Sequence, residues 1–234
     1  MIKMVEKTGK RRGTAAHVVQ PCPRFQSWSG VHGDLPQRVT DGILRAIERS
    51  PSGILPLDVL ASISPASRGT LLATLCRLAR EGRIVRLKRG AYSVAPIRDG
   101  YAAAQVKFGG YIAFASALRL HGLIAEEPFT IMVATPKTSK TARAGNLEFR
   151  AVALGERAVG SERIGAHDVS SRAKTLFDCL FLPQYSVEAE KLADAYAAAG
   201  MKKGEWQEFE RYAERFGGRK RKGMLGFKKK CGVL

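Results

Sequence analysis

Residues 67–94 read SRGTLLATLCRLAREGRIVRLKRGAYSV, and this stretch contains two different hydrophobic periods. In its first half the leucines recur three and four residues apart, which is the spacing of one face of an α-helix. Gly82 follows as a residue suited to the end of a helix. The second half predicts two short strands joined by a turn at Lys88–Gly90, where glycine can adopt a positive φ. The expected helix covers residues 67–81, and the expected strands cover 83–87 and 91–94.

Two further helices are expected ahead of this stretch. Thr40–Asp41 offers capping side chains for a first helix, and the turn-forming residues Ser50–Gly53 end it. Ile54–Leu55 suits a short strand, and Pro56 opens a second, short helix. The resulting order is helix, strand, helix, helix and basic hairpin. This is the order of a winged helix-turn-helix, which we expect over residues 39–98.

The following block, residues 101–216, predicts a mixed α/β domain. Period-two alternation in Phe129–Val133 and Leu147–Val152 indicates half-buried strands, and we expect a small antiparallel sheet. The segment between these strands is interpreted as a loop carrying lysines and arginine. Helices are expected at Tyr111–His121, from Ser170 to Pro183, from Ser186 to Gly200 and along the face from Trp206 to Phe216. The fold class is therefore α+β, with an N-terminal winged helix-turn-helix and a mixed α/β C-terminal domain.

Basic segments flank these two blocks. Residues 1–38 are rich in Lys, Arg, Gly and Pro, and we expect a flexible N-terminal arm. Residues 217–234 contain Arg219–Lys222 and Lys228–Lys230, and we interpret them as a basic tail. Blocks of like charge repel one another and stay solvated, and they often bind nucleic acid.

The charge balance indicates a polyanionic partner. The chain has 39 Lys and Arg against 21 Asp and Glu, a formal net charge of +18 and an isoelectric point near 10.2. Such a field attracts polyanions, and neutralising phosphates releases counterions, so binding should depend on salt. A charge that serves solubility alone is the alternative. No apolar run approaches the roughly 18–20 residues needed to span a bilayer, so we expect a cytoplasmic protein without membrane contact.

Enzymatic and metal-binding motifs are not evident. The cysteines at 22, 76, 179 and 231 lie too far apart for a structural zinc site, and we expect them to be reduced and unpaired. There is no P-loop and no dinucleotide fingerprint, so no cofactor and no enzyme activity are expected. Asp178, Glu148 and Glu126–Glu127 are candidate carboxylates for a metal-dependent nuclease, but Arg150, which shares a strand face with Glu148, replaces the lysine that such a site would need. His121 ends a helix and is interpreted as structural.

In a helix-turn-helix the third helix enters the major groove, and its exposed N-terminal residues contact base edges. If the leucines face the core, the outward positions are Ser67, Arg68, Thr70, Thr74 and Arg77. Arginine can pair bidentately with guanine, and serine or threonine can bond bases or phosphates. Lys88 and Arg89 at the hairpin tip are expected to contact the DNA backbone or minor groove. A winged helix used only for protein contact is the alternative.

Three segments carry a resemblance to a known family. Gly110–Leu123, GYIAFASALRLHGL, resembles the helix that follows the winged helix in AbiEi-type antitoxins. Val169–Asp178, followed by Pro183, is similar to a later helix of that family. Arg77–Ile84 leading to Arg89–Tyr92 looks like the exit of its recognition helix and its wing. The likeness extends over residues 40–200.

The resemblance implies a regulator of a type IV toxin–antitoxin or abortive-infection operon. Such proteins bind double-stranded DNA at inverted repeats upstream of their own operon and repress it. The partner gene encodes a nucleotidyltransferase-like toxin, with which no tight complex is expected. The basic tail and the long N-terminal arm depart from the family pattern.

The sequence therefore predicts a DNA-binding transcriptional repressor that acts as an AbiEi-like antitoxin and autoregulates its operon. One alternative is a non-catalytic RNA- or DNA-binding protein whose affinity comes mainly from the basic arms. Another is a nucleic-acid-processing enzyme that uses the winged helix only for docking.

Overall fold

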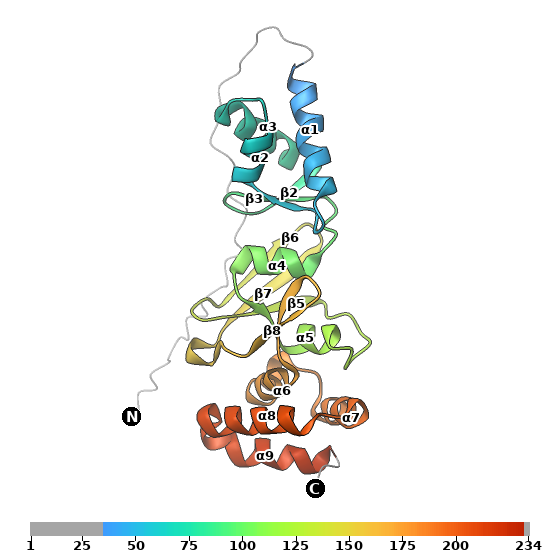
Figure 1. Ribbon diagram of the computed structural model, residues 1–234, viewed down its shortest axis with the longest axis vertical. Coiled ribbons are helices and arrows are strands. Elements are labelled where there is room, and N and C mark those ends of the chain that lie inside the picture. The colour runs from blue at the N-terminus through green and yellow to red at the C-terminus, as the bar shows by residue number, and fades with distance from the viewer. Residues whose placement is uncertain (1–34, 232–234) are drawn as a thin grey trace, which may run out of the picture. The chain divides into compact units, whose positions relative to one another are not determined.

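A computed structural model describes residues 35–231, and within them the fold is mixed α+β, with nine α-helices and two sheets of three and six strands (Figure 1). The expected N-terminal arm lies almost entirely outside the described residues. None of the helices in residues 35–231 is long and apolar enough to cross a membrane. The elements are described below as an N-terminal region, residues 35–98, and a C-terminal body, residues 100–231.

The N-terminal region contains three helices and a three-stranded antiparallel sheet of order β1-β3-β2. The expected element order is present, but the first helix begins at Leu35, so Thr40 lies inside it and is buried rather than capping it. The elements are α1 (Leu35–Arg49), β1 (Ile54–Pro56), α2 (Leu57–Ile63), α3 (Arg68–Arg80), β2 (Ile84–Lys88) and β3 (Ala91–Val94).

The helices of this region enclose a core of leucines and isoleucines. Leu71, Leu75 and Leu78 of α3 are fully buried because their spacing puts them on one helical face. Ile47 of α1 and Leu60 of α2 meet them there. Each such side chain stabilises the fold by roughly 1.5–3 kcal/mol relative to exposure. The same face therefore fixes which side of α3 remains open to solvent.

The sheet of the C-terminal body is mixed, so the expectation of a small antiparallel sheet is wrong. Its strands are β4 (Tyr111–Ile112), β5 (Thr130–Thr135), β6 (Lys140–Ala144), β7 (Leu147–Ala153), β8 (Ser161–Ile164) and β9 (His167–Ser170). They lie in the order β6-β7-β5-β4-β9-β8. The segment interpreted as a loop forms edge strand β6, so β7 returns parallel to β5. β4 and β9 are also parallel.

The apolar segment expected to form one helix at 111–121 divides into strand β4 and helix α5 (Phe114–Leu120). Phe114 has a positive φ of 57°, which turns the chain between the two elements. Just before β4, Gly110 has a φ of 127°, and a Cβ there would lie 2.2 Å from the carbonyl oxygen of Ala134. A short apolar run does not distinguish a buried strand from a buried helix, which explains the wrong prediction.

Helix α4 (Gly100–Phe108) lies between the two sheets (Figure 1). Its Ala103 and Ala104 are fully buried, and they belong to one cluster with Leu87 of the small sheet and Val133 of the large sheet. Lys107 Nζ also donates a hydrogen bond to the Leu87 carbonyl oxygen at 2.6 Å. The N-terminal region and the C-terminal body thus share a core through α4.

The other face of the large sheet is covered by α5 and by helices that follow the sheet in sequence. These helices are α6 (Arg172–Phe181), α7 (Ala189–Ala199), α8 (Lys203–Phe216) and α9 (Arg221–Lys230). Met224 and Phe227 of α9 are buried in the same cluster as α6 and α8. The expectation that residues 217–234 form a solvated tail is therefore wrong for α9. Its two buried apolar residues are three apart and share one face, while its lysines remain at the surface.

Candidate nucleic-acid interface

Ser67 fixes the first turn of α3 as its N-cap residue. Its Oγ accepts a hydrogen bond from the Thr70 backbone N–H at 3.3 Å and lies 3.0 Å from Thr70 Oγ1. Both side chains are exposed. The cap uses one of the N–H groups at the helix start and leaves others free, where the helix dipole favours negative charge. This end of α3 is therefore suited to contact with a phosphate.

Arg68 follows directly at the first position of α3. It is exposed, and it has no hydrogen-bond or ion-pair partner within residues 35–231. Lys88 and Arg89 at the tip of the β2–β3 hairpin are also exposed and have no partner in the same range. Their turn is closed by Gly90, whose φ of 78° is the positive value expected from the sequence. Three of the predicted residues thus present cations that a ligand can reach.

The expectation that Thr74 faces outward is wrong. Its side chain is buried, and its Oγ1 donates a hydrogen bond to the Thr70 carbonyl oxygen at 2.9 Å. Thr74 lies three residues after Leu71 and four before Leu78, so it shares their core face. It cannot contact a base while α3 is packed in this way.

Arg77 is already engaged by two other residues. One guanidinium nitrogen donates a hydrogen bond to Thr40 Oγ1 of α1 at 2.7 Å, and another lies 3.2 Å from Glu81 Oε1. These contacts link α1 to the last turn of α3. Arg77 therefore contributes to helix packing, although its position in α3 led to the expectation that it contacts bases.

The centre of the exposed face of α3 was missed in the sequence analysis. It is formed by Gly69, Leu72, Ala73 and Arg80, which lie opposite the buried leucines. Leu72 is 37% exposed, and Arg80 has no hydrogen-bond or ion-pair partner among the described residues. Helical spacing from the leucines alone locates these positions, so the signal was present. The centre of this face therefore presents to a ligand the guanidinium group of Arg80, two apolar side chains and the backbone of Gly69.

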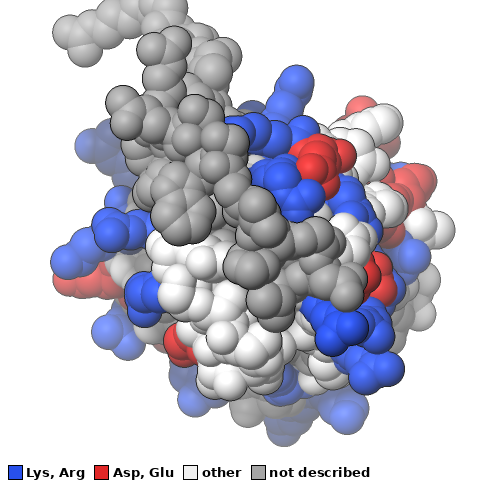
Figure 2. All heavy atoms as spheres, turned by 90° about the horizontal axis from the view of Figure 1, so that it is seen from above, with Lys and Arg blue, Asp and Glu red and all other residues white. Residues whose placement is uncertain are grey.

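Acidic residues are scarce in the segment that forms α3 and the hairpin. Residues 67–94 contain seven Lys and Arg but one carboxylate, Glu81. Arg83 and Arg86 are exposed on the same segment, while Ile84 and Leu87 between them are buried. Figure 2 views the molecule from the end at which α1–α3 lie, and Lys and Arg side chains there flank an uncharged area. The surface charge of this segment is therefore unbalanced.

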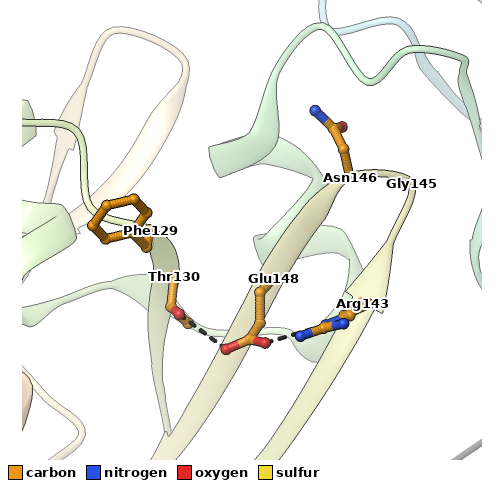
Figure 3. A pocket seen from close by; sticks show the side chains of 6 residues that line it. All are labelled: Phe129, Thr130, Arg143, Gly145, Asn146 and Glu148. Atoms are coloured by element: carbon orange, nitrogen blue, oxygen red, sulfur yellow. Dashed lines mark hydrogen bonds and ion pairs between the residues drawn. The ribbon is translucent and has the colours of Figure 1, made fainter.

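The carboxylates considered for catalysis do not come together. Glu148 accepts hydrogen bonds from Thr130 Oγ1 at 3.0 Å and Arg143 Nε at 3.3 Å, which lower the pKa of its carboxyl. These three residues line an open hollow of about 340 Å³, and Figure 3 shows the side chains of Phe129 and Asn146 pointing away from the carboxylate. Within residues 35–231 no group of His, Cys, Asp and Glu is arranged to hold a metal ion.

Asp178 lies far from that hollow, in α6, where it forms a buried ion pair with Lys174. Burial raises the pKa of Asp178 and lowers that of Lys174, and their mutual attraction opposes both shifts. His121 Nε2 donates a hydrogen bond to the Ser170 carbonyl oxygen at 2.7 Å, which agrees with its structural interpretation. These groups hold elements of the C-terminal body together.

The cysteines divide into two kinds. Cys179 and Cys231 are free, as expected from their spacing, and both are buried. Cys76, in α3, is disulfide-bonded, so the expectation of an unpaired cysteine is wrong at this position. Cys22 lies outside the described residues.

The fold is similar to that of the RV2827C protein from Mycobacterium tuberculosis, a crystal structure. The TM-score is 0.59 at 15% sequence identity, over 85% of this chain and 78% of that chain. At this identity the likeness concerns the fold alone. No model of a known protein family matches the sequence, and no curated protein matches it.

Proposed function

We propose that this chain is a DNA-binding transcriptional repressor whose residues 39–98 form a winged helix-turn-helix. The observation that carries the proposal is the exposed, capped start of α3 followed by a basic hairpin whose tip cations have no partner in residues 35–231. Unpaired cations repel one another and weaken the fold, so their concentration on one segment favours a role in binding a polyanion.

The proposed complex places α3 in the major groove. Arg68 at its start pairs with guanine O6 and N7, and the side chains of Leu72 and Ala73 contact thymine methyl groups. Lys88 and Arg89 contact phosphates or the flanking minor groove. Two copies on an inverted repeat would double this small footprint.

We further propose that the repressor is an AbiEi-like antitoxin that acts in the cytoplasm on its own operon. Support comes from the resemblance of Gly110–Leu123 and Val169–Asp178, which supply central elements of the C-terminal body. The functional partner would be a nucleotidyltransferase-like toxin, without a tight complex between the two proteins. This role requires no cofactor and no catalytic group.

The test is binding of the purified protein to a duplex from upstream of its own gene, beside a scrambled duplex of equal length. Measurements at roughly 50 and 200 mM salt separate phosphate attraction from base recognition, because the former falls steeply with salt. We expect a preference of about a thousandfold that persists at the higher salt. Equal affinities that fall together would contradict an operator-specific repressor.

A second candidate is a non-catalytic protein that binds RNA or DNA with little sequence preference. It is favoured by the exposed face of α3, where Gly69, Leu72 and Ala73 offer no side-chain hydrogen-bond donors. Removing residues 217–234 would be a poor test, because Met224 and Phe227 are buried. Replacing the exposed Lys222 and Lys229 by alanine is the cleaner test, and this candidate requires a general loss of affinity.

A further inference from the structure

The edge strand of the large sheet lies beside the edge strand of the small sheet. β6 contacts β2, and a Cβ built on Gly145, just after β6, would be 3.9 Å from Val85 of β2. β6 and β2 are each the outermost strand on one side of their sheet. Within the described residues, no further strand pairs with their outer edges. The surface of the hairpin therefore continues onto the C-terminal body at β6.

Lys140, the first residue of β6, lies on the side of the sheet that faces α4. The register pairs Lys140 with Ala151 and Ala142 with Phe149, so these side chains share the face that packs against α4. Lys107, near the end of α4, donates its hydrogen bond to Leu87, and burial and the charge of Lys140 lower its pKa. Two lysines from different elements thus lie on the same side of the large sheet, and Lys107 is bonded to β2.

A third lysine, Lys137, lies three residues before Lys140 in an ordered turn. Lys137 lies in the turn before β6 and is exposed, as is Lys140. Thr135 Oγ1 donates to the Thr138 carbonyl oxygen at 2.7 Å and accepts from the Thr138 N–H at 3.0 Å. The turn is therefore fixed before any ligand arrives, which lowers the entropy lost on binding.

Some lysines of the C-terminal body pair with a carboxylate, whereas the lysines just before β6 and at its start do not. Lys191 pairs with Glu126, and Lys228 pairs with Glu210 at 3.0 Å. Lys137 and Lys140 have no such partner within residues 35–231. Like charges placed together without neutralisation are stabilised when phosphates bind them.

We propose that Lys107, Lys137 and Lys140 form a lysine track that binds the DNA backbone where the duplex leaves the β2–β3 hairpin. This inference rests on the proposed function. It extends the proposed DNA-contact surface from α3 and the hairpin onto the C-terminal body. Lys137 and Lys140 contact phosphates directly, and Lys107 links the track to β2. The duplex bound is therefore longer than the one that α3 and the hairpin cover alone.

The test compares two duplex lengths with the Lys137→Ala/Lys140→Ala variant. One duplex covers about one helical turn, and the other carries the same central sequence over about three turns. On the long duplex we expect the slope of log affinity against log salt to become shallower by about 2, because two phosphate contacts are lost. On the short duplex we expect no change. Lys222→Ala/Lys229→Ala, on α9, removes the same charge elsewhere and should leave both slopes unchanged.

Lysines on an edge strand also prevent the edge strands of different molecules from pairing. Their replacement by alanine could therefore lower DNA binding through aggregation, and a second variant tests this alternative. Lys137→Glu/Lys140→Glu keeps the edge charged, so an effect on the long duplex in this variant cannot arise from aggregation. An unchanged slope in both track variants, or an equal change in the α9 control, would overturn the track and leave the repressor. A wild-type protein that binds neither duplex would overturn the proposed function and the track together.

Discussion

The segment from α3 to the β2–β3 hairpin and the helices that follow the large sheet hold positive charge in different ways. In the N-terminal region Arg68 and Lys88 are exposed and have no partner within residues 35–231. In the C-terminal body Lys174 is fully buried beside Asp178, and Lys228 at the surface pairs with Glu210. Paired charges hold a fold together, whereas unpaired like charges add repulsion and are useful only when a ligand neutralises them. The contrast separates cations that a ligand can reach from cations that hold the fold together.

The largest expected effect comes from breaking the buried ion pair between Lys174 and Asp178. Asp178→Ala leaves the Lys174 ammonium buried without a counter-charge, so we expect a loss of about 3–5 kcal/mol in the free energy of unfolding. Equilibrium unfolding in urea measures this loss of stability. The affinity of the remaining folded protein for DNA should not change.

The exposed pair Lys228–Glu210 provides the control for that measurement. Glu210→Ala should reduce stability by about 1 kcal/mol or less, because solvent screens this pair. Replacing the buried pair as a whole, with Lys174→Met/Asp178→Leu, should restore most of the stability lost in Asp178→Ala. If Asp178→Ala were no more harmful than Glu210→Ala, the contrast between the two regions would fail.

A smaller effect is expected at Arg68, and it appears in the affinity for DNA. Arg68→Ala should weaken binding to the upstream duplex by about 1–3 kcal/mol and relax the preference at one base pair, because a bidentate contact to guanine is lost. Stability should be unchanged, since Arg68 has no intramolecular partner among residues 35–231. Competition binding against single base-pair variants of the duplex measures this effect.

Arg77→Ala is the matched control on the same helix. It removes the hydrogen bond to Thr40, so we expect a loss of about 1 kcal/mol in stability and no change in sequence preference. Reversed results for the two arginines, with Arg77 deciding base preference, would refute the assignment of roles made from their contacts.

The smallest expected effect concerns pH and His121. Burial lowers the pKa of His121 below its ordinary value of 6.5, although the Ser170 carbonyl and Glu162 oppose the shift. As the pH falls below 6.5, the unfolded chain takes up a proton that the folded protein refuses, so stability is lost through this range. His121→Gln retains an N–H donor for Ser170 and should show a weaker pH dependence. Urea midpoints between pH 7.5 and 5 test this, and equal slopes would contradict it.

The elements of the N-terminal region could be predicted because their signals are local. The leucine spacing of α3, the glycine at 82 and the turn at Lys88–Gly90 each act within a few residues. The start of α1 at Leu35 was missed, since Thr40–Asp41 resembles a cap but lies inside the helix. Local patterns therefore gave the type and order of the elements more reliably than their ends.

The sheet of the C-terminal body depends on partners that are distant in sequence. Lys140–Ala144 has little strand character of its own and becomes β6 only by pairing with β7. β8 and β9 were missed for the same reason, because each is short and charged. The mixed topology could not be derived from residues considered one segment at a time.

The candidate interface was predicted in part. The exposure of Arg68, Lys88 and Arg89 follows from their positions at a helix start and a hairpin tip. Thr74 was misplaced although its spacing from the leucines puts it inside. The partner of Arg77 lies 37 residues away in the chain, so no local pattern could reveal it.

The position of α4 between the two sheets also sets an order of events during synthesis of the chain. A growing polypeptide that has left the ribosome only as far as residue 98 already contains α1 to β3, yet Ile54 and Leu87 still lack the cover that α4 and the large sheet provide. The core between the large sheet and helices α5–α9 is not complete until Met224 and Phe227 have left the ribosome. The segment proposed to recognise DNA is thus made before the elements that support it, and its cover is complete only after the large sheet has been translated.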